Sequence, residues 1–265
     1  MSDTLTTTAL ILGLVEGITE FLPISSTGHM IIVGDLLGFT SGFSKLFEVV
    51  IQLGAILAVC WLYRQKLWQT LTGIATRGPA QIFARNVLVA FLPAVVIGLL
   101  AHDFIKRVLF SPNVVGWAFV VGGIAILAAE RWRPKSTCAS TEEMPIATAA
   151  KIGLFQCLAM IPGTSRSGAT IVGALLLGVT REAATEFSFF LAIPTMAGAT
   201  VLDLWKARHD LAGIDGSALG IGFVVAFVSA LVVVRGLVGF VSQHGFAPFA
   251  WYRIVAGLVI LYFVR

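Results

Sequence analysis

The chain has 265 residues, of which 57% are hydrophobic and only 12% are charged. A soluble globular domain carries about 25% charged residues, so this composition cannot cover an ordinary water-facing surface and indicates an integral membrane protein. It excludes a disordered chain and a disulfide-stapled secreted module, and the net charge of +4 is too small and too scattered for a nucleic-acid partner.

Six clean apolar stretches follow one another along the chain and predict transmembrane helices, since a span needs about 20 predominantly apolar residues. They cover 47–63, 87–101, 114–129, 187–204, 218–234 and 246–264. These spans predict an all-α protein, and the chain length leaves room for one integral membrane domain over 1–265.

Two further apolar stretches, 8–39 and 152–179, are interrupted in the middle by proline, glycine and hydroxyl residues. The interruptions read Pro23-Ile-Ser-Ser-Thr-Gly-His29 and Pro162-Gly-Thr-Ser-Arg-Ser-Gly168. Non-helical backbone at membrane depth is tolerated only where protein or water satisfies its polar groups. Each stretch therefore predicts a re-entrant helix-loop-helix hairpin that lines a site.

The two interrupted stretches align with each other without gaps at a shift of 140 residues. Matched pairs are Gly13 and Gly153, Ser25 and Ser165, Gly28 and Gly168, and Ile31 and Ile171. Each hairpin is followed by three spans, which predicts two repeats, over about 1–130 and about 150–265. An odd number of spans per repeat makes the second copy enter from the opposite side, so we expect inverted-topology repeats.

Basic residues in the connections predict the orientation. The first long connection contains Arg64, Lys66, Arg77 and Arg85. The positive-inside rule places this connection and the basic connection over 131–151 in the cytoplasm. Both termini and the loops over 101–113 and 206–216 are then expected outside, which gives the first hairpin a periplasmic mouth.

Glu16 and Glu20 lie one helical turn apart in the first hairpin and share a helix face. An ionisable residue at membrane depth costs about 2.5 kcal/mol or more, so the pair points to a binding role. Paired carboxylates suit a hard divalent cation, Mg²⁺ or Ca²⁺, or general-base chemistry. The alternative is a shallow helix whose carboxylates reach interfacial water.

His29 follows the hydroxyl residues Ser25, Ser26 and Thr27 in the first interruption. A nucleophile, a base and an orienting acid could meet in this arrangement, because the carboxylate pair precedes it closely. The alternative is a packed histidine that bonds to a backbone carbonyl.

The second interruption combines glycine, hydroxyl groups and a fixed cation at a predicted helix start. Its candidate binding residues are Gly163, Thr164, Ser165, Arg166, Ser167 and Thr170. A helix N-terminus supplies free N–H groups and about half a positive charge, and arginine can bind two phosphate oxygens at once. The segment predicts a phosphate site. The alternative is a plain turn with Arg166 extended to the lipid headgroups.

The runs Glu16-Gly-Ile-Thr-Glu20-Phe-Leu-Pro-Ile-Ser-Ser-Thr-Gly-His29 and Pro162-Gly-Thr-Ser-Arg-Ser-Gly-Ala-Thr170 carry a family resemblance over essentially the whole chain. The sequence resembles the bacterial undecaprenyl-pyrophosphate phosphatases of the bacitracin-resistance type. The resemblance implies an inner-membrane enzyme that removes the terminal phosphate from the C55 polyprenyl pyrophosphate carrier and regenerates the monophosphate for peptidoglycan synthesis. It also implies a divalent metal requirement, and bacitracin resistance on overproduction.

Under this resemblance, the Arg166 loop and the second-arm helix starts hold the phosphates, while a cation on Glu16 and Glu20 bridges oxygens. The preferred hypothesis is attack by the Ser26 hydroxyl, with His29 or Glu20 taking its proton. The competing mechanism uses His29 as nucleophile or as the base for a water, and sequence spacing does not separate the two.

A second class of function fits the same architecture. Inverted repeats with broken helices also describe transporters and lipid flippases, whose half-helix ends bind an anionic headgroup without chemistry. The expected contacts are the polyprenyl pyrophosphate and membrane lipids. Glycines at 116, 122 and 123 could pack helices within one chain or between two, so a homodimer stays open.

Overall fold

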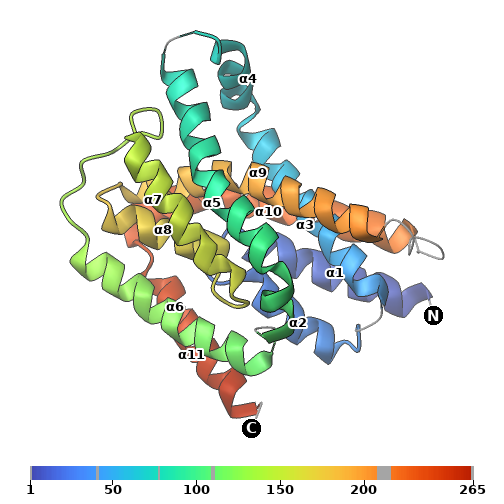
Figure 1. Ribbon diagram of the computed structural model, residues 1–265. Coiled ribbons are helices and arrows are strands. Elements are labelled where there is room, and N and C mark those ends of the chain that lie inside the picture. The colour runs from blue at the N-terminus through green and yellow to red at the C-terminus, as the bar shows by residue number, and fades with distance from the viewer. Residues whose placement is uncertain (1, 40–41, 77, 109–110, 208–215, 264–265) are drawn as a thin grey trace.

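The computed structural model describes residues 2–39, 42–76, 78–108, 111–207 and 216–263 (Figure 1). The predicted outer loop over 206–216 therefore lies largely outside the described residues. Within them the chain is helical, with one isolated bridge between Cys138 and Val179 in place of any β-sheet. The longer helices are α1 (Ser2–Thr19), α3 (Gly42–Leu62), α5 (Pro79–Val108), α6 (Pro112–Trp132), α9 (Arg181–Ala207), α10 (Gly216–His244) and α11 (Ala247–Phe263). The shorter ones are α2 (Ser26–Leu36), α4 (Arg64–Gly73), α7 (Ile146–Gln156), the 3₁₀ turn η1 (Cys157–Met160) and α8 (Arg166–Leu176).

Four of the described helices are long and apolar enough to cross a membrane: α5, α6, α9 and α10. The stretch predicted as the first span forms α3 and continues into α4 after a bend of 74°, and the two helices together can make a fifth span. The last predicted span forms α11, which is shorter at 17 residues. The prediction of an all-helical, multi-pass membrane protein is confirmed.

Both interrupted stretches form two helical arms around a break. The first break covers 20–25 between α1 and α2, and the second covers 161–165 between η1 and α8. Both are shorter than the sequence suggested, because the second arm is already helical at Ser26 and Arg166. Each of these helices is capped by the serine before it, whose Oγ accepts a hydrogen bond from the backbone N–H three residues on.

The backbone of the two breaks repeats at the same shift of 140 residues as the sequence. Ser25 has φ 72° and Ser165 has φ 74°, and they are the only non-glycine residues with positive φ in the described part of the chain. Gly38 and Gly178, which follow α2 and α8, also share a positive φ, at 65° and 79°. The duplicated sequence therefore folds into duplicated local geometry.

Each broken segment packs against a long helix of the other half of the chain: α1 lies on α10, and α7 lies on α5. A Cβ atom added at Gly13 would lie 2.6 Å from the Gly222 carbonyl oxygen, and one at Gly153 would lie 2.3 Å from that of Ala90. Only glycine permits these two close crossings, and they occur at matched positions.

Helices α6 and α11 run side by side at one edge of the molecule (Figure 1). The glycines of α6 serve this contact, because a Cβ at Gly116 would meet Leu261 at 2.8 Å and a Cβ at Gly123 would meet the Ala250 carbonyl oxygen at 2.7 Å. They pack helices within one chain, and the homodimer gains no support from them.

Candidate active site

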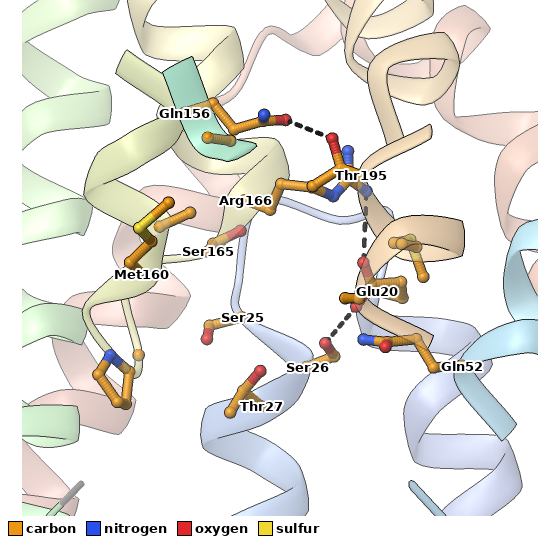
Figure 2. A pocket seen from close by; sticks show the side chains of 16 residues that line it. Glu20, Ser25, Ser26, Thr27, Gln52, Gln156, Met160, Ser165, Arg166 and Thr195 are labelled. Atoms are coloured by element: carbon orange, nitrogen blue, oxygen red, sulfur yellow. Dashed lines mark hydrogen bonds and ion pairs between the residues drawn. The ribbon is translucent and has the colours of Figure 1, made fainter. Parts of the chain in front are cut away.

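A cavity of about 240 Å³ lies between the two breaks (Figure 2), and we call it the polar cavity. Both halves of the chain contribute to its wall. The first half contributes Glu20, Ser25, Ser26, Thr27, Gln52 and Ala94, and the second contributes Gln156, Ala159, Met160, Pro162, Gly163, Ser165, Arg166, Thr195, Met196 and Ala199. The structure thus brings the two predicted interruptions, which are far apart in the sequence, to one place.

Glu20 connects Ser26 and Arg166 at the centre of this wall. One carboxylate oxygen accepts a hydrogen bond from the Ser26 hydroxyl, and the other lies 3.3 Å from Nη2 of Arg166 (Figure 2). The side chains of Arg166 and Glu20 are only 11% and 7% exposed. A carboxylate in this position can take the proton of the serine hydroxyl, while the arginine guanidinium pairs with its other oxygen.

Arg166 begins α8, so its side chain lies beside free N–H groups of a helix N-terminus. Its Nη1 donates to the carbonyl oxygen of Ser188 at 2.8 Å. Its buried Nε makes no hydrogen bond with any described residue, although a buried polar group rarely stays unpaired. Arg166 also lines the polar cavity, so its guanidinium is placed beside an anionic ligand bound there.

Glu16 lies behind Glu20 and does not line the polar cavity. It is 4% exposed, and its Oε1 has no hydrogen-bond partner among the described residues. Its electrostatic neighbours are Glu20, Glu48 and Arg166. A carboxylate oxygen buried without a donor beside a second carboxylate fits a hard cation. The described residues contain no group of three or more histidine, cysteine, aspartate or glutamate side chains that could hold a metal by themselves.

His29 points away from the polar cavity. Its Nδ1 donates to the carbonyl oxygen of Ser25 at 2.7 Å, and its Nε2 lies 2.6 Å from the hydroxyl of Tyr252, whose ring stacks on the imidazole. Both ring nitrogens are engaged in this way, and Ser26 is bonded to Glu20 instead. The geometry favours Glu20 over His29 as the base for Ser26.

The predicted phosphate-binding residues fall into two groups. Ser25, Thr27, Gly163 and Ser165 line the polar cavity, whereas Thr164, Ser167 and Thr170 do not. Ser167 donates to the carbonyl oxygen of Leu22 at 2.8 Å and so joins the two breaks. Thr170 donates to the Ser188 hydroxyl at 2.8 Å, which fastens α8 to α9. These two hydroxyls hold the site together from behind.

Arg253 is a site residue that the sequence reasoning missed. It lies on α11, is 0% exposed and donates only to backbone carbonyls within the described residues. The acceptors are Pro23 at 3.1 Å, Gly163 at 2.9 Å, Thr164 at 2.8 Å, Ala118 at 2.8 Å and Phe119 at 3.3 Å. One guanidinium thereby joins both breaks to α6. The sequence did contain an indication of its role: Arg253 is a single arginine within the apolar stretch 246–264. A charged residue inside a membrane segment usually has a functional role.

The fold and the cavity together define a class: a multi-pass helical membrane protein with a serine, a carboxylate and an arginine buried where two broken helices meet. Residues 9–259 match the family described as bacitracin resistance protein BacA. The chain therefore belongs to the BacA family.

Curated relatives agree with this assignment. The chain is 56% identical over 253 residues to a protein of Rhizorhabdus wittichii named undecaprenyl-diphosphatase, with 95% of both chains covered. It is 58% identical over 252 residues to the undecaprenyl-diphosphatase of Nitrosospira multiformis, with 95% of this chain and 92% of the relative covered. It is 57% identical over 253 residues to that of Methylococcus capsulatus, with 96% and 93% covered.

Proposed function

We propose that this protein is a membrane phosphatase that hydrolyses undecaprenyl pyrophosphate to undecaprenyl phosphate and inorganic phosphate. The observation that carries the proposal is the Ser26–Glu20–Arg166 contact at the wall of the polar cavity. Relatives that carry the name of this activity match the chain almost from end to end, which supports it. The reaction recycles the lipid carrier for peptidoglycan synthesis. Overproduction of the enzyme confers bacitracin resistance.

Arg166 and the N–H groups at the starts of α2 and α8 bind the pyrophosphate oxygens. Glu20 takes the proton of the Ser26 hydroxyl as Oγ attacks the terminal phosphorus in line with the bridging oxygen. The bond to that oxygen breaks and undecaprenyl phosphate leaves. The protonated Glu20 gives this proton to the departing phosphate oxygen and becomes a base again. Water then attacks the phosphorus of the phosphoserine, Glu20 accepts the proton of the water and passes it to Ser26 Oγ as the P–O bond breaks, and inorganic phosphate is released.

We assign the divalent cation to Glu16 and Glu20, because Glu16 neighbours the carboxylate that contacts Ser26 and its Oε1 has no hydrogen-bond partner among the described residues. When bound, the cation offsets negative charge on the phosphate oxygens. Two protein carboxylates favour Mg²⁺ over Ca²⁺, since Mg²⁺ is held by one or two carboxylates together with waters and phosphates, whereas Ca²⁺ takes six to eight oxygen ligands.

We further propose that the chain forms one integral domain in the bacterial inner membrane, with two inverted repeats that each contain a re-entrant hairpin and three spans. The matched φ angles of the breaks and the reciprocal packing of α1 on α10 and α7 on α5 support this arrangement. The basic α4 and the loop after α6 then face the cytoplasm, and the polar cavity opens to the periplasmic side.

Phosphate release by the purified protein in detergent tests the proposed function. We expect undecaprenyl pyrophosphate to be hydrolysed in Mg²⁺, the activity to disappear with a chelator, and Arg166→Ala to lower kcat by about 10²–10³-fold. Arg235→Ala, on an exposed face of α10, is the matched control and should leave kcat unchanged. A wild-type protein that releases no phosphate with Mg²⁺ or Ca²⁺ would contradict the proposal and favour lipid transport.

A further inference from the structure

A second cavity, of about 530 Å³, lies between α5 and α9. Its wall is formed mainly by apolar side chains, among them Phe91, Val95, Leu99, Met160, Val201 and Leu202. We call it the α5–α9 groove. Its volume is about twice that of the polar cavity.

The groove adjoins the polar cavity. Ala94, Met160, Thr195 and Ala199 line both spaces, so the two cavities are immediate neighbours. The Thr195 hydroxyl, which lies where the two spaces meet, donates its hydrogen bond to the Leu191 carbonyl at 2.7 Å. Its donor is therefore already used within α9. The polar and charged groups of the polar cavity thus lie next to a groove with a mainly apolar wall, which also includes the charged residue Asp203.

We propose that the α5–α9 groove binds the part of the substrate's prenyl chain next to the pyrophosphate. This inference rests on the proposed function, which places the pyrophosphate in the polar cavity. An amphiphile with an anionic head and an apolar tail matches the change in lining from Glu20, Ser26 and Arg166 to aliphatic and aromatic side chains. The tail gains by replacing loosely packed lipid with fixed contacts.

The length of the groove limits how much of the tail it holds. On α9 it extends from Thr195 to Trp205, ten residues along a helix, or about 15 Å. That is about half of the roughly 30 Å hydrocarbon thickness of a bilayer. The groove lies on the C-terminal halves of α5 and α9, which the positive-inside orientation assigns to the outer leaflet. The distal part of the chain then remains in the lipid.

Two glycines keep the groove open. A Cβ atom at Gly98 would lie 3.6 Å from Met160 Cε, and one at Gly198 would lie 3.5 Å from Phe91 Cζ, both ordinary van der Waals distances. A leucine at either position therefore extends into the groove without meeting backbone. Gly220 on α10 has no atom within 4 Å of its hypothetical Cβ, so the same substitution there projects into open space.

The test compares Gly198→Leu with Gly220→Leu in hydrolysis of undecaprenyl pyrophosphate. Filling the groove should raise KM about tenfold and leave kcat within twofold, because the reacting groups lie in the polar cavity. Gly220→Leu should leave both constants unchanged. An unchanged KM in Gly198→Leu, or an equal rise in both variants, would overturn the groove assignment while leaving the phosphatase intact.

Photo-crosslinking of the wild-type protein gives a second readout that does not depend on how the variant folds or on turnover. The probe is a prenyl pyrophosphate with a benzophenone in the isoprene units next to the pyrophosphate. Adducts should map to 91–99 and 195–205, and adducts confined to other helices would overturn the groove. Absence of phosphate release by the wild type refutes the proposed function instead, and the crosslink pattern still decides where a prenyl chain binds.

Discussion

Two buried arginines have different partners at the breaks. Arg166 pairs with the carboxylate of Glu20 and lines the polar cavity, and its Nε has no hydrogen-bond partner in the part of the chain that the structure describes. Arg253 donates all of its guanidinium hydrogen bonds to five backbone carbonyls, so none remains to bind a substrate. The first is therefore suited to binding and the second to holding the two breaks in register.

Replacing Arg253 by methionine should destabilise the protein strongly. The substitution leaves five carbonyl oxygens without this donor, and each unsatisfied buried group costs about 1–3 kcal/mol, so a loss on the order of 3 kcal/mol or more is expected. Thermal unfolding in detergent measures it. Arg235→Met on the exposed face of α10 is the control, and equal melting temperatures for the two variants would show that Arg253 does not hold the breaks.

The residue types at the breaks predicted which side chains surround the polar cavity. They were a poorer guide to which partner each side chain contacts. Glu20, Ser26 and Arg166 stand out because charge and hydroxyl groups are rare in apolar segments. The direction of His29 was not predictable, since its partner Tyr252 comes from the last helix. The role of Arg253 was not predictable either, because its hydrogen-bond acceptors are distant in sequence and are backbone atoms.

At the scale of elements, each second arm starts with a serine in an unfavourable backbone conformation. A non-glycine residue at positive φ costs about 1–2 kcal/mol, and such strain is concentrated at functional sites. The serine side chain offsets part of it by capping: Ser165 Oγ accepts from the Gly168 N–H at 3.0 Å. The sharp turn aims the N-termini of α2 and α8 at the polar cavity.

This strain predicts an inverted order of stability for two variants at one site. Both Ser165→Ala and Ser165→Gly lose the cap, but glycine adopts φ 74° without steric cost. The glycine variant should therefore be more stable than the alanine variant by about 1 kcal/mol in the free energy of unfolding, and should unfold at a higher temperature. In an ordinary helix interior, such as Ser229 on α10, alanine should be the more stable of the two. An alanine variant as stable as the glycine variant at 165 would contradict the strained turn.

The apolar stretches predicted the helices because length and hydropathy decide whether a segment enters a membrane. The bend of 74° between α3 and α4 was not predicted. It follows from the polar, basic helix beginning at Arg64, which has no buried residue and cannot continue into the apolar interior. The sequence match at a shift of 140 residues did indicate where the local backbone geometry recurs, since serines and glycines with positive φ occupy matched positions.

Across the whole molecule, the two halves contact each other through the packing of α1 on α10 and of α7 on α5. A group of ion pairs centred on Lys66 adds a further contact. The ammonium of Lys66 lies 2.6 Å from Glu142 in the loop after α6 and 3.7 Å from Glu186 on α9. It also donates to the Thr141 hydroxyl at 2.9 Å. The bond from Lys66 holds the pKa of the Glu142 carboxyl below its usual range, despite partial burial.

Because the folded-state pKa of Glu142 is lowered, its contribution to stability is present above the unfolded pKa and is lost as the pH falls through the folded pKa. Glu142→Gln should lower stability by at most about 1 kcal/mol at pH 7, since the pair is partly exposed. The difference from wild type should fade below about pH 4. Thermal unfolding at several pH values measures this, with the exposed Glu143→Gln as control, and a difference that persists at low pH would argue against the ion pair.

In the proposed mechanism, Ser26 is activated by Glu20 and attacks the terminal phosphorus in a cavity shared by two broken helices. Rapid acid quench with undecaprenyl pyrophosphate labelled in its terminal phosphate, followed by peptide mapping, identifies the residue that takes up the phosphate. We expect label on Ser26 in wild type, and loss of label and of turnover in Ser26→Ala. Label on His29, or near-normal turnover by Ser26→Ala, would contradict it.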